Sequence, residues 1–79
     1  MEKFVVAMPT VSDVKKFCDA CSALDFEVDV LHGHYVLDAK SIMSLLSLDL
    51  SKSVEVKPSH DLDEKQLAEL KEAIKEFRV

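Results

Sequence analysis

The fold of this chain can be inferred from one stretch near its middle, Lys40-Ser41-Ile42-Met43-Ser44-Leu45-Leu46-Ser47-Leu48-Asp49-Leu50. The stretch predicts a helix of two or three turns, because Ser41 can accept hydrogen bonds from first-turn backbone N–H groups, which have no partner inside a helix. The nine residues after Ser41 include six large apolar side chains. One neighbouring element cannot cover all six, so some should face solvent or a partner protein.

Length and composition predict one small globular domain over residues 1–79. Of these residues 48% are apolar and 32% are charged, which is not the composition of a disordered chain. The net charge of −5 argues against nucleic acid or an anionic membrane as partner, since both require a basic surface. No apolar run approaches the roughly 18–20 residues of a membrane span. The first residues lack the layout of a secretory signal, so we expect a cytoplasmic protein.

The N-terminal part of the chain predicts a strand followed by a helix. Strand-forming residues fill positions 3–8, before a proline. Thr10 and Asp13 have the spacing of a capping box, which predicts a helix over about 11–24. Apolar residues recur along this segment at steps of three and four, as on one buried helix face. The residues expected on that face are Val11, Val14, Phe17, Cys18, Cys21 and Leu24.

A β-hairpin is predicted next, with strands over 26–30 and 35–39 and a turn at Gly33. Apolar and acidic residues alternate in the first of these strands, which is typical of a half-buried strand. Whichever two residues form the turn, the pairing places the same side chains on one face. The residues on that face are Phe26, Val28, Val30, Tyr35, Leu37 and Ala39.

The C-terminal part predicts a strand over 54–57, ended by Pro58, and a last helix. Asp61 and Glu64 have the spacing of a capping box for this helix. Its expected buried face consists of Leu67, Leu70, Ile74 and Phe77. The element order is therefore β-α-β-β-α-β-α. Alternating strands indicate an antiparallel sheet with helices on one face, although they do not determine the strand order.

The cysteines and histidines do not predict a catalytic or metal site. Cys18 and Cys21 form a C-x-x-C inside the first predicted helix and on its apolar side, so we interpret them as buried core thiols. Two thiols are too few for a structural zinc site. The three histidines, His32, His34 and His60, are interpreted as ordinary surface residues.

The central stretch also resembles the signature of HPr, the histidine-containing phosphocarrier family of the bacterial sugar phosphotransferase system. Lys40-Ser41-Ile42-Met43 and Ser47-Leu48 match that signature at fixed spacing, and the element order agrees over nearly the whole chain. The resemblance implies an α+β fold, a two-layer open-faced β-sandwich. In it a four-stranded antiparallel sheet of order 1-4-2-3 carries three helices on one face. We also expect a monomer without a cofactor.

The resemblance fails at the phosphate-accepting site of the family, a histidine at the start of the first helix with a nearby arginine. Aligned back from Lys40, the histidine position holds Thr10 and the arginine position holds Ser12. Residues 1–31 contain neither His nor Arg. We therefore expect no catalytic residue and no enzyme, but a regulatory or protein-binding module. The alternatives are a phosphocarrier that uses a non-standard acceptor, such as Thr10 or His34, and an unrelated role on the same fold.

Ser41 is the remaining candidate for regulation. In one bacterial branch of the family the matching serine is phosphorylated by a dedicated kinase, so the resemblance implies a phosphorylation site here; the other interpretation is that Ser41 only caps the helix. The residues expected to bind partners are Lys40, Ile42, Met43 and Leu46. Of these, Met43 and Leu46 should face solvent most. The expected partners are other proteins, among them phosphotransferase-system or transcription-regulatory proteins.

Overall fold

The strands of this protein form one antiparallel sheet in the order β1-β4-β2-β3, which confirms the expected α+β fold class and strand order. The computed structural model describes residues 2–79, so Met1, the first residue of the predicted domain, lies outside the described residues. The elements, in chain order, are β1 (Phe4–Val6), α1 (Val11–Ser22), β2 (Val28–His32), β3 (Tyr35–Asp38), α2 (Ile42–Leu45), β4 (Val54–Pro58) and α3 (Glu64–Ile74).

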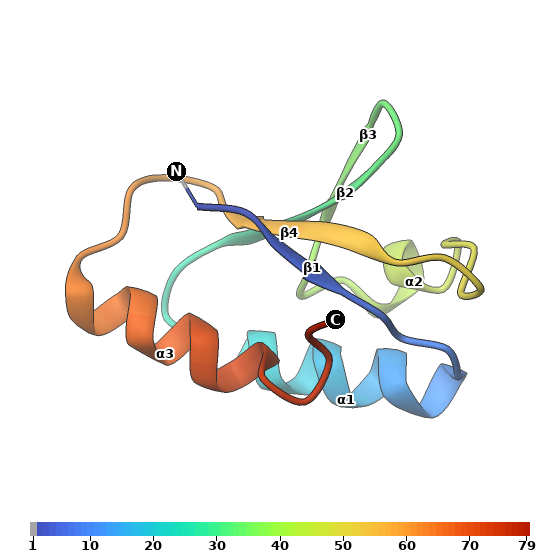
Figure 1. Cartoon of the computed structure of the whole chain (residues 1–79), viewed down its shortest axis with the longest axis horizontal. Coiled ribbons are helices and arrows are strands. Elements are labelled where there is room, and N and C mark those ends of the chain that lie inside the picture. The colour runs from blue at the N-terminus through green and yellow to red at the C-terminus, as the bar shows by residue number, and fades with distance from the viewer. Residues whose placement is uncertain (1) are drawn as a thin grey trace.

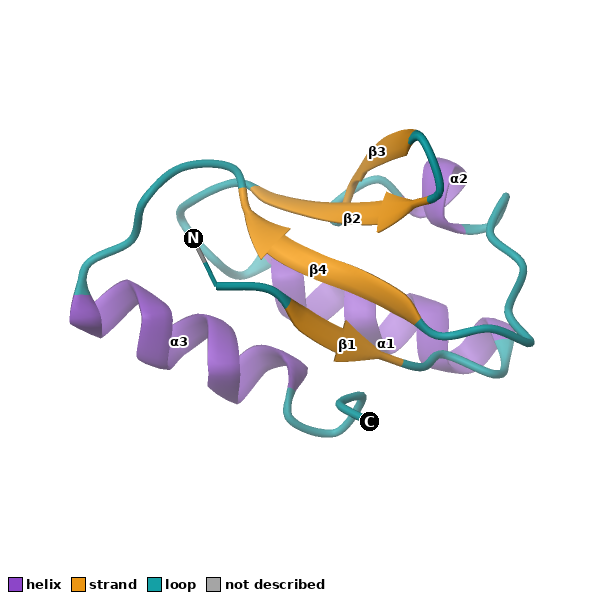
Figure 2. Cartoon of the chain, turned by 45° about the horizontal axis from the view of Figure 1, so that its top comes forward, coloured by secondary structure: helices purple, strands orange, loops and turns teal. Residues whose placement is uncertain are grey.

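The helices and the sheet form two layers around one core. Helices α1 and α3 lie side by side under the sheet, and α2 packs against α1 at one end of the molecule (Figure 1 and Figure 2). The rings of Phe17 and Phe77 pack edge to face, with 5.5 Å between their centroids. The largest fully buried side chains, which fill the space between the layers, are Phe17, Leu45, Leu70, Ile74, Val6, Val14, Val28, Val30, Val56 and Cys21.

The first strand and helix are shorter than predicted, although their buried faces are mostly as expected. β1 ends at Val6, two residues early, yet Met8 is still buried. Helix α1 ends at Ser22, and Thr10 and Asp13 form the predicted capping box. The prediction for Val11 is wrong, because its side chain is 49% exposed. Val11 lies in the first turn at the margin of the apolar face, where neither the sheet nor α3 covers it.

The hairpin is displaced along the chain relative to its prediction, but the predicted face is confirmed. β2 runs from Val28 to His32 instead of 26–30, and its turn is Gly33-His34, because His32 pairs with Tyr35. Gly33 has a φ of 60°, a conformation that favours glycine in such turns. The tip of the hairpin extends beyond the helices (Figure 1), so Tyr35 is 70% exposed although it lies on the helix-side face.

Helix α2 has a single turn, so the expected two or three turns are wrong. After Leu45 the backbone tightens: the Ser47 N–H donates to the Ser44 C=O at 3.2 Å, and the Leu48 N–H to the Leu45 C=O at 3.1 Å. Bonds three residues apart are typical of a helix that is ending. The chain can then turn, which brings Leu48 back into the core.

The start of α3 also differs from its prediction. The N-cap is Asp63, two residues after the predicted Asp61. The Asp63 carboxylate accepts from the Gln66 N–H at 2.8 Å, and the Gln66 side chain accepts from the Asp63 N–H at 3.2 Å. The sequence contains two pairs with the spacing of a capping box, Asp61 with Glu64 and Asp63 with Gln66. The structure uses the second pair, in which each side chain accepts from the backbone N–H of the other residue.

The C-terminal segment closes one edge of the sheet. The Ala7 N–H donates to the Phe77 C=O at 2.8 Å, and the Val79 N–H donates to the Val5 C=O at 3.0 Å. The guanidinium carbon of Arg78 lies 4.9 Å from the centre of the Phe4 ring. Residues 77–79 therefore occupy the backbone groups of β1 that would otherwise face solvent.

Candidate functional site

Ser41 begins α2, as the sequence predicts. The Ser41 Oγ accepts from the Ser44 N–H at 3.5 Å and also lies 3.2 Å from the Ser44 Oγ. A preceding turn holds Ser41 in place, because the Asp38 C=O accepts from the Ser41 N–H at 3.0 Å and the Asp38 carboxylate from the Lys40 N–H at 2.9 Å. The N-cap role of Ser41 is therefore confirmed, and its phosphorylation stays a prediction.

The apolar side chains after Ser41 divide into a core group and an exposed pair. Leu45 is fully buried, and Ile42 is half-buried against the core. Met43 is 79% exposed and Leu46 is 42% exposed. The expectation that these two face solvent is confirmed. A role for Met43, Leu46 or Ile42 in partner binding stays a prediction.

Lys40 has its ammonium group directed at the protein itself. Its Nζ donates to the Leu24 C=O at 2.8 Å and lies 3.9 Å from a carboxylate oxygen of Glu27. The lysine therefore ties the start of α2 to the segment that follows α1. This contact satisfies a backbone carbonyl just beyond the end of a helix, and a role for Lys40 in partner binding stays a prediction.

The start of α1, where the resemblance places a phosphate-accepting histidine, has no cationic group in its first turn. Thr10 and Ser12 are both exposed. The Thr10 Oγ1 accepts from the Asp13 N–H at 3.1 Å and donates to the Asp13 carboxylate at 2.9 Å. The same carboxylate accepts from the Thr10 N–H at 3.2 Å. A phosphoryl group on Thr10 would meet a carboxylate there and no guanidinium, and like charges at this distance repel.

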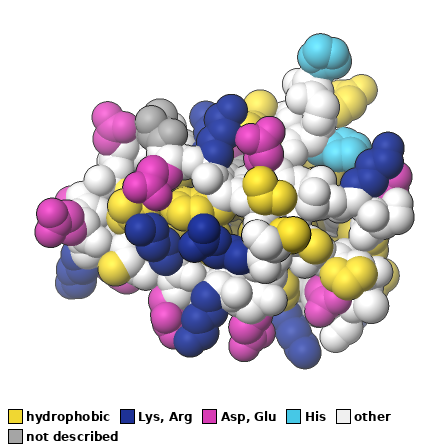
Figure 3. Space-filling view, in the orientation of Figure 1, with side chains coloured by type: hydrophobic (Ala, Val, Ile, Leu, Met, Phe, Trp, Pro, Cys, Tyr) yellow, Lys and Arg dark blue, Asp and Glu magenta, His cyan; other side chains and the backbone are white. Residues whose placement is uncertain are grey.

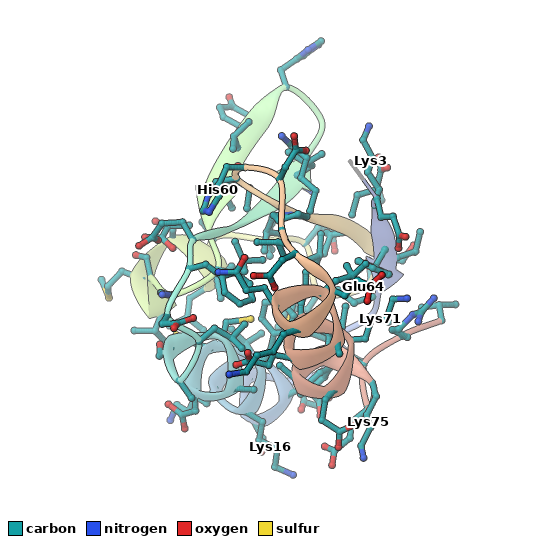
Figure 4. The ribbon with its side chains drawn as sticks, turned by 90° about the vertical axis from the view of Figure 1, so that its left-hand side faces the viewer. Lys3, Lys16, His60, Glu64, Lys71 and Lys75 are labelled. Atoms are coloured by element: carbon teal, nitrogen blue, oxygen red, sulfur yellow. The ribbon has the colours of Figure 1, made fainter. Side chains whose placement is uncertain are left out.

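The histidines lie in two places, since His32 and His34 are at the hairpin and His60 follows β4. His60 lies on the segment between β4 and α3 (Figure 4). Two lysines of the helices, Lys16 and Lys71, point outward in the same view. His34 is at the exposed tip of the hairpin. In residues 2–79 no three His, Cys, Asp or Glu side chains are grouped as metal ligands.

One hollow was missed by the sequence analysis. His32, Tyr35 and Leu37 of the hairpin and Ser47 after α2 line a cavity of about 250 Å³. Alternation along β3 puts Tyr35 and Leu37 on one face, and pairing of His32 with Tyr35 adds His32 to it. Nothing local in the sequence places Ser47 opposite them. The carboxyl group of Asp49, nearby, has its pKa lowered mainly by hydrogen bonds from Ser51, with smaller contributions from Lys52 and His32.

Both cysteines are core residues. Cys18 and Cys21 are free thiols and buried. Burial, with a smaller contribution from Cys18, raises the pKa of Cys21 to about 12. A reactive cysteine needs a lowered pKa and access to solvent, so the arrangement is unsuited to thiol chemistry and the core interpretation is confirmed.

Exposed apolar atoms also occur elsewhere on the surface. Figure 3 shows them at several separate places between charged side chains. The α2 surface, defined here as Ile42, Met43 and Leu46, differs because two exposed residues, Met43 and Leu46, lie three positions apart close after the serine that caps the helix. None of the helices in residues 2–79 is long and apolar enough to cross a membrane.

Comparison with known proteins identifies the fold. No protein-family model matches the chain, and no curated protein matches it. Among solved structures it is similar to HPr-C-His from Thermoanaerobacter tengcongensis, with a TM-score of 0.70 and 21% sequence identity. The alignment covers 95% of this chain and 92% of that one. This similarity shows an HPr-like fold.

Proposed function

We propose that this protein is an HPr-like binding module that contacts other proteins through the α2 surface and does not carry phosphate on a histidine. The observation that carries the proposal is the exposure of Met43 and Leu46 one turn apart, next to the Ser41 cap. Exposed apolar side chains that the core does not need are available to a partner. Met43 also suits a surface that adapts to more than one shape, because its side chain is flexible and polarizable.

Two features support the absence of a phosphocarrier role. Residues 1–31 contain neither His nor Arg. When the sequence is aligned with the HPr signature back from Lys40, Thr10 and Ser12 take the positions of the family's histidine and arginine. The Asp13 carboxylate, 2.9 Å from the Thr10 hydroxyl, places negative charge where a phosphoryl group would have to form. On this proposal the protein is not an enzyme, acts in the cytoplasm, and binds phosphotransferase-system or transcription-regulatory proteins.

Ser41 is the proposed regulatory position. The residue is half-buried, and its hydroxyl forms hydrogen bonds with Ser44 of α2. A phosphate on Ser41 would add about 1.5–2 negative charges at the N-terminus of α2. Partner binding through an apolar patch would then change, while the core under α2 stays as it is.

Partner capture tests the proposal. Tagged protein is used to capture partners from a bacterial lysate, and the double variant Met43→Ala, Leu46→Ala is compared with the parent. Val5→Ala is the matched control, because Val5 is as exposed as Leu46, at 42%, but lies in β1. We expect the double variant to lose the proteins that the parent and the control retain. Equal capture by all three proteins would refute the α2 surface as the contact.

Phosphotransfer is tested separately, so that the two parts of the proposal fail independently. The protein is incubated with phosphoenolpyruvate and the upstream phosphotransferase of the system, and total bound phosphate is measured before and after acid treatment, because phosphohistidine is acid-labile and phosphothreonine is acid-stable. We expect none. Stoichiometric phosphate on a histidine, or loss of phosphate in Thr10→Ala, would instead support the phosphocarrier with a non-standard acceptor.

A further inference from the structure

The outer face of the sheet, which points away from α1 and α3, is uncovered. In Figure 2 the strands lie in front of α1, and none of the described helices crosses them. The strand register places two rows of side chains across this face, one mostly apolar and one charged. The apolar row runs from β1 to β3 and consists of Val5, Glu55, Leu31 and Val36. Its two ends, Val5 and Val36, are 42% and 61% exposed, so apolar surface is open on both sides of the sheet.

The charged row changes sign in the middle of the sheet. Lys57 of β4 pairs with Asp29 of β2, and Asp29 pairs with Asp38 of β3. The β1–β4 register, continued by one residue, places Lys3 beside Lys57. The Lys3 Nζ lies 3.9 Å from a carboxylate oxygen of Glu55, so this side chain is on the same face. From β1 to β3 the row therefore carries two positive charges and then two negative charges.

The contacts that these charged groups make within the chain do not use all their bonding capacity. The Asp29 carboxylate accepts from the Ser59 hydroxyl at 2.9 Å, and the Asp38 carboxylate accepts from the Lys40 N–H at 2.9 Å. An ionised carboxylate has about four acceptor sites, so each can accept further bonds. Lys57 is half-buried, and no carboxylate among residues 2–79 forms an ion pair with its ammonium group. The centre of the outer face thus holds a partly desolvated cation without an acidic partner.

The charged row is complementary to a second copy of itself. A second sheet can be turned by half a revolution about an axis parallel to the strands, between β4 and β2, so that β4 of each copy lies over β2 of the other. Lys57 then faces Asp29 of the second copy on both sides of the axis, and Lys3 faces Asp38 in the same way. In the apolar row, Val5 faces Val36. Opposite charges and apolar side chains are therefore matched in one arrangement.

Other ways of stacking the two faces are less favourable. An axis across the strands, or one along β4 or β2, places Lys57 over Lys57, places Asp29 over Asp29, or lays the charged row on the apolar row. Like charges that face each other across an interface are costly. In the favoured arrangement Glu55 lies over Leu31 of the second copy, and its carboxylate keeps the Lys3 ammonium of its own chain as a partner. The sign change in the charged row thus selects one axis.

We propose that two copies of this chain associate through the outer faces of their sheets, about an axis between β4 and β2. Their two four-stranded sheets then form a sandwich, with the sheets about 10 Å apart and the helices outside. Strands of three to five residues give each face an area of only roughly 300 Å². The dimer is therefore weak, with a Kd of about 0.1–1 mM, and the monomer expected from the sequence is its dissociated form. The α2 surface belongs to the helix layer and stays open to other partners.

Sedimentation equilibrium from about 50 µM to 1 mM tests the proposal, in about 0.15 M salt to screen the net charge of the chain. The average mass should rise with concentration from 8.9 kDa toward twice that value. A protein that keeps the mass of one chain at about 1 mM would overturn the proposal.

Charge reversals on the two sides of the axis test the arrangement. Lys57→Glu faces Asp29 of the second copy with a like charge, and Asp29→Lys does the same to Lys57, so each variant alone should raise the Kd by about 10-fold or more. An equimolar mixture of the two variants should associate like the parent, because each reversed charge meets its opposite. Lys16→Glu is the matched control. It makes the same change of net charge as Lys57→Glu on the outward side of α1 (Figure 4) and should associate like the parent.

Methyl NMR of the parent shows which surface associates and does not depend on the variants. The methyl signals of Val5, Leu31 and Val36 should shift as the concentration rises, and that of Met43 in α2 should stay in place. Thermal melts check that the variants fold. Single reversals that dimerise like the parent, a mixture of two folded variants that stays monomeric, or shifts confined to Met43 would each overturn the proposal.

Discussion

Single alanine substitutions along α2 should separate the residue that holds the fold from those that are free to bind. Leu45 is fully buried, Leu46 is 42% exposed and Met43 is 79% exposed. Complete burial of a Leu or Met side chain contributes about 1.5–3 kcal/mol. Met43 has about a fifth of its surface covered, so Met43→Ala should change the free energy of unfolding by about 0.5 kcal/mol or less. Alanine also favours the helix slightly.

Larger losses are expected at the two leucines. Leu46 is more than half covered, so Leu46→Ala should cost about 1 kcal/mol. Leu45→Ala leaves a cavity next to the core and should cost about 3–4 kcal/mol. For a domain of this size these losses correspond to Tm decreases of about 4–8 °C per kcal/mol. The order Leu45, Leu46, Met43 follows from burial alone, because the three side chains have similar volumes and lie in α2 or, for Leu46, at its C-cap.

Urea denaturation followed by circular dichroism measures the three free energies, with the parent as reference. Similar m-values in all variants would show that the differences in midpoint report stability. The double variant Met43→Ala, Leu46→Ala should lose about the sum of the single effects, roughly 1.5 kcal/mol, and stay folded at 25 °C. If Met43→Ala proves as destabilising as Leu45→Ala, Met43 is a core residue. The α2 surface then cannot be the contact proposed above.

Three further predictions concern the core and the caps. Raising the pH from about 8 to 10 should lower the stability of the parent by on the order of 1 kcal/mol more than that of Cys21→Ala. The reason is that the pKa of Cys21, raised to about 12 by burial, leaves the thiol protonated in the folded state while it ionises near 9.0 in the unfolded chain; equal pH profiles would contradict this. Asp63→Ala should cost about 1 kcal/mol in urea denaturation and Asp61→Ala less than about 0.5 kcal/mol, since Asp63 forms the capping box; the reverse order would mean that the helix begins earlier. Phe77→Ala should cost about 3–4 kcal/mol, because the ring is buried against Phe17; a loss below about 1 kcal/mol would show that the C-terminal segment is not part of the core.

Local patterns were sufficient for most of the elements and for their buried faces. The capping box of Thr10 and Asp13, the alternation around Val28 and Val30, and the serine cap of α2 each depend on residues a few positions apart. Hydrogen bonds and side-chain periodicity over such short distances can be read from the chain itself. The strand order needed the family resemblance, because alternation does not state which strands are neighbours.

Contacts between distant segments decided the remaining features. Two capping boxes were available before α3, and the helix begins at Asp63, where packing of Leu70 and Ile74 against the core is compatible with the reciprocal box. The length of α2 depends on Leu48 turning back to the core. The direction of the Lys40 ammonium depends on a carbonyl sixteen residues earlier.

The surfaces proposed for function are among the features decided by contacts between distant segments. The sequence by itself determined that the six apolar side chains after Ser41 could not all be buried. It also determined that no histidine or arginine precedes residue 32. Only the tertiary structure decided that Tyr35 and Val36 stay exposed, and that residues 77–79 close the β1 edge. Exposure is a property of what lies nearby in space, and the covering residues come from segments whose positions no local interaction specifies.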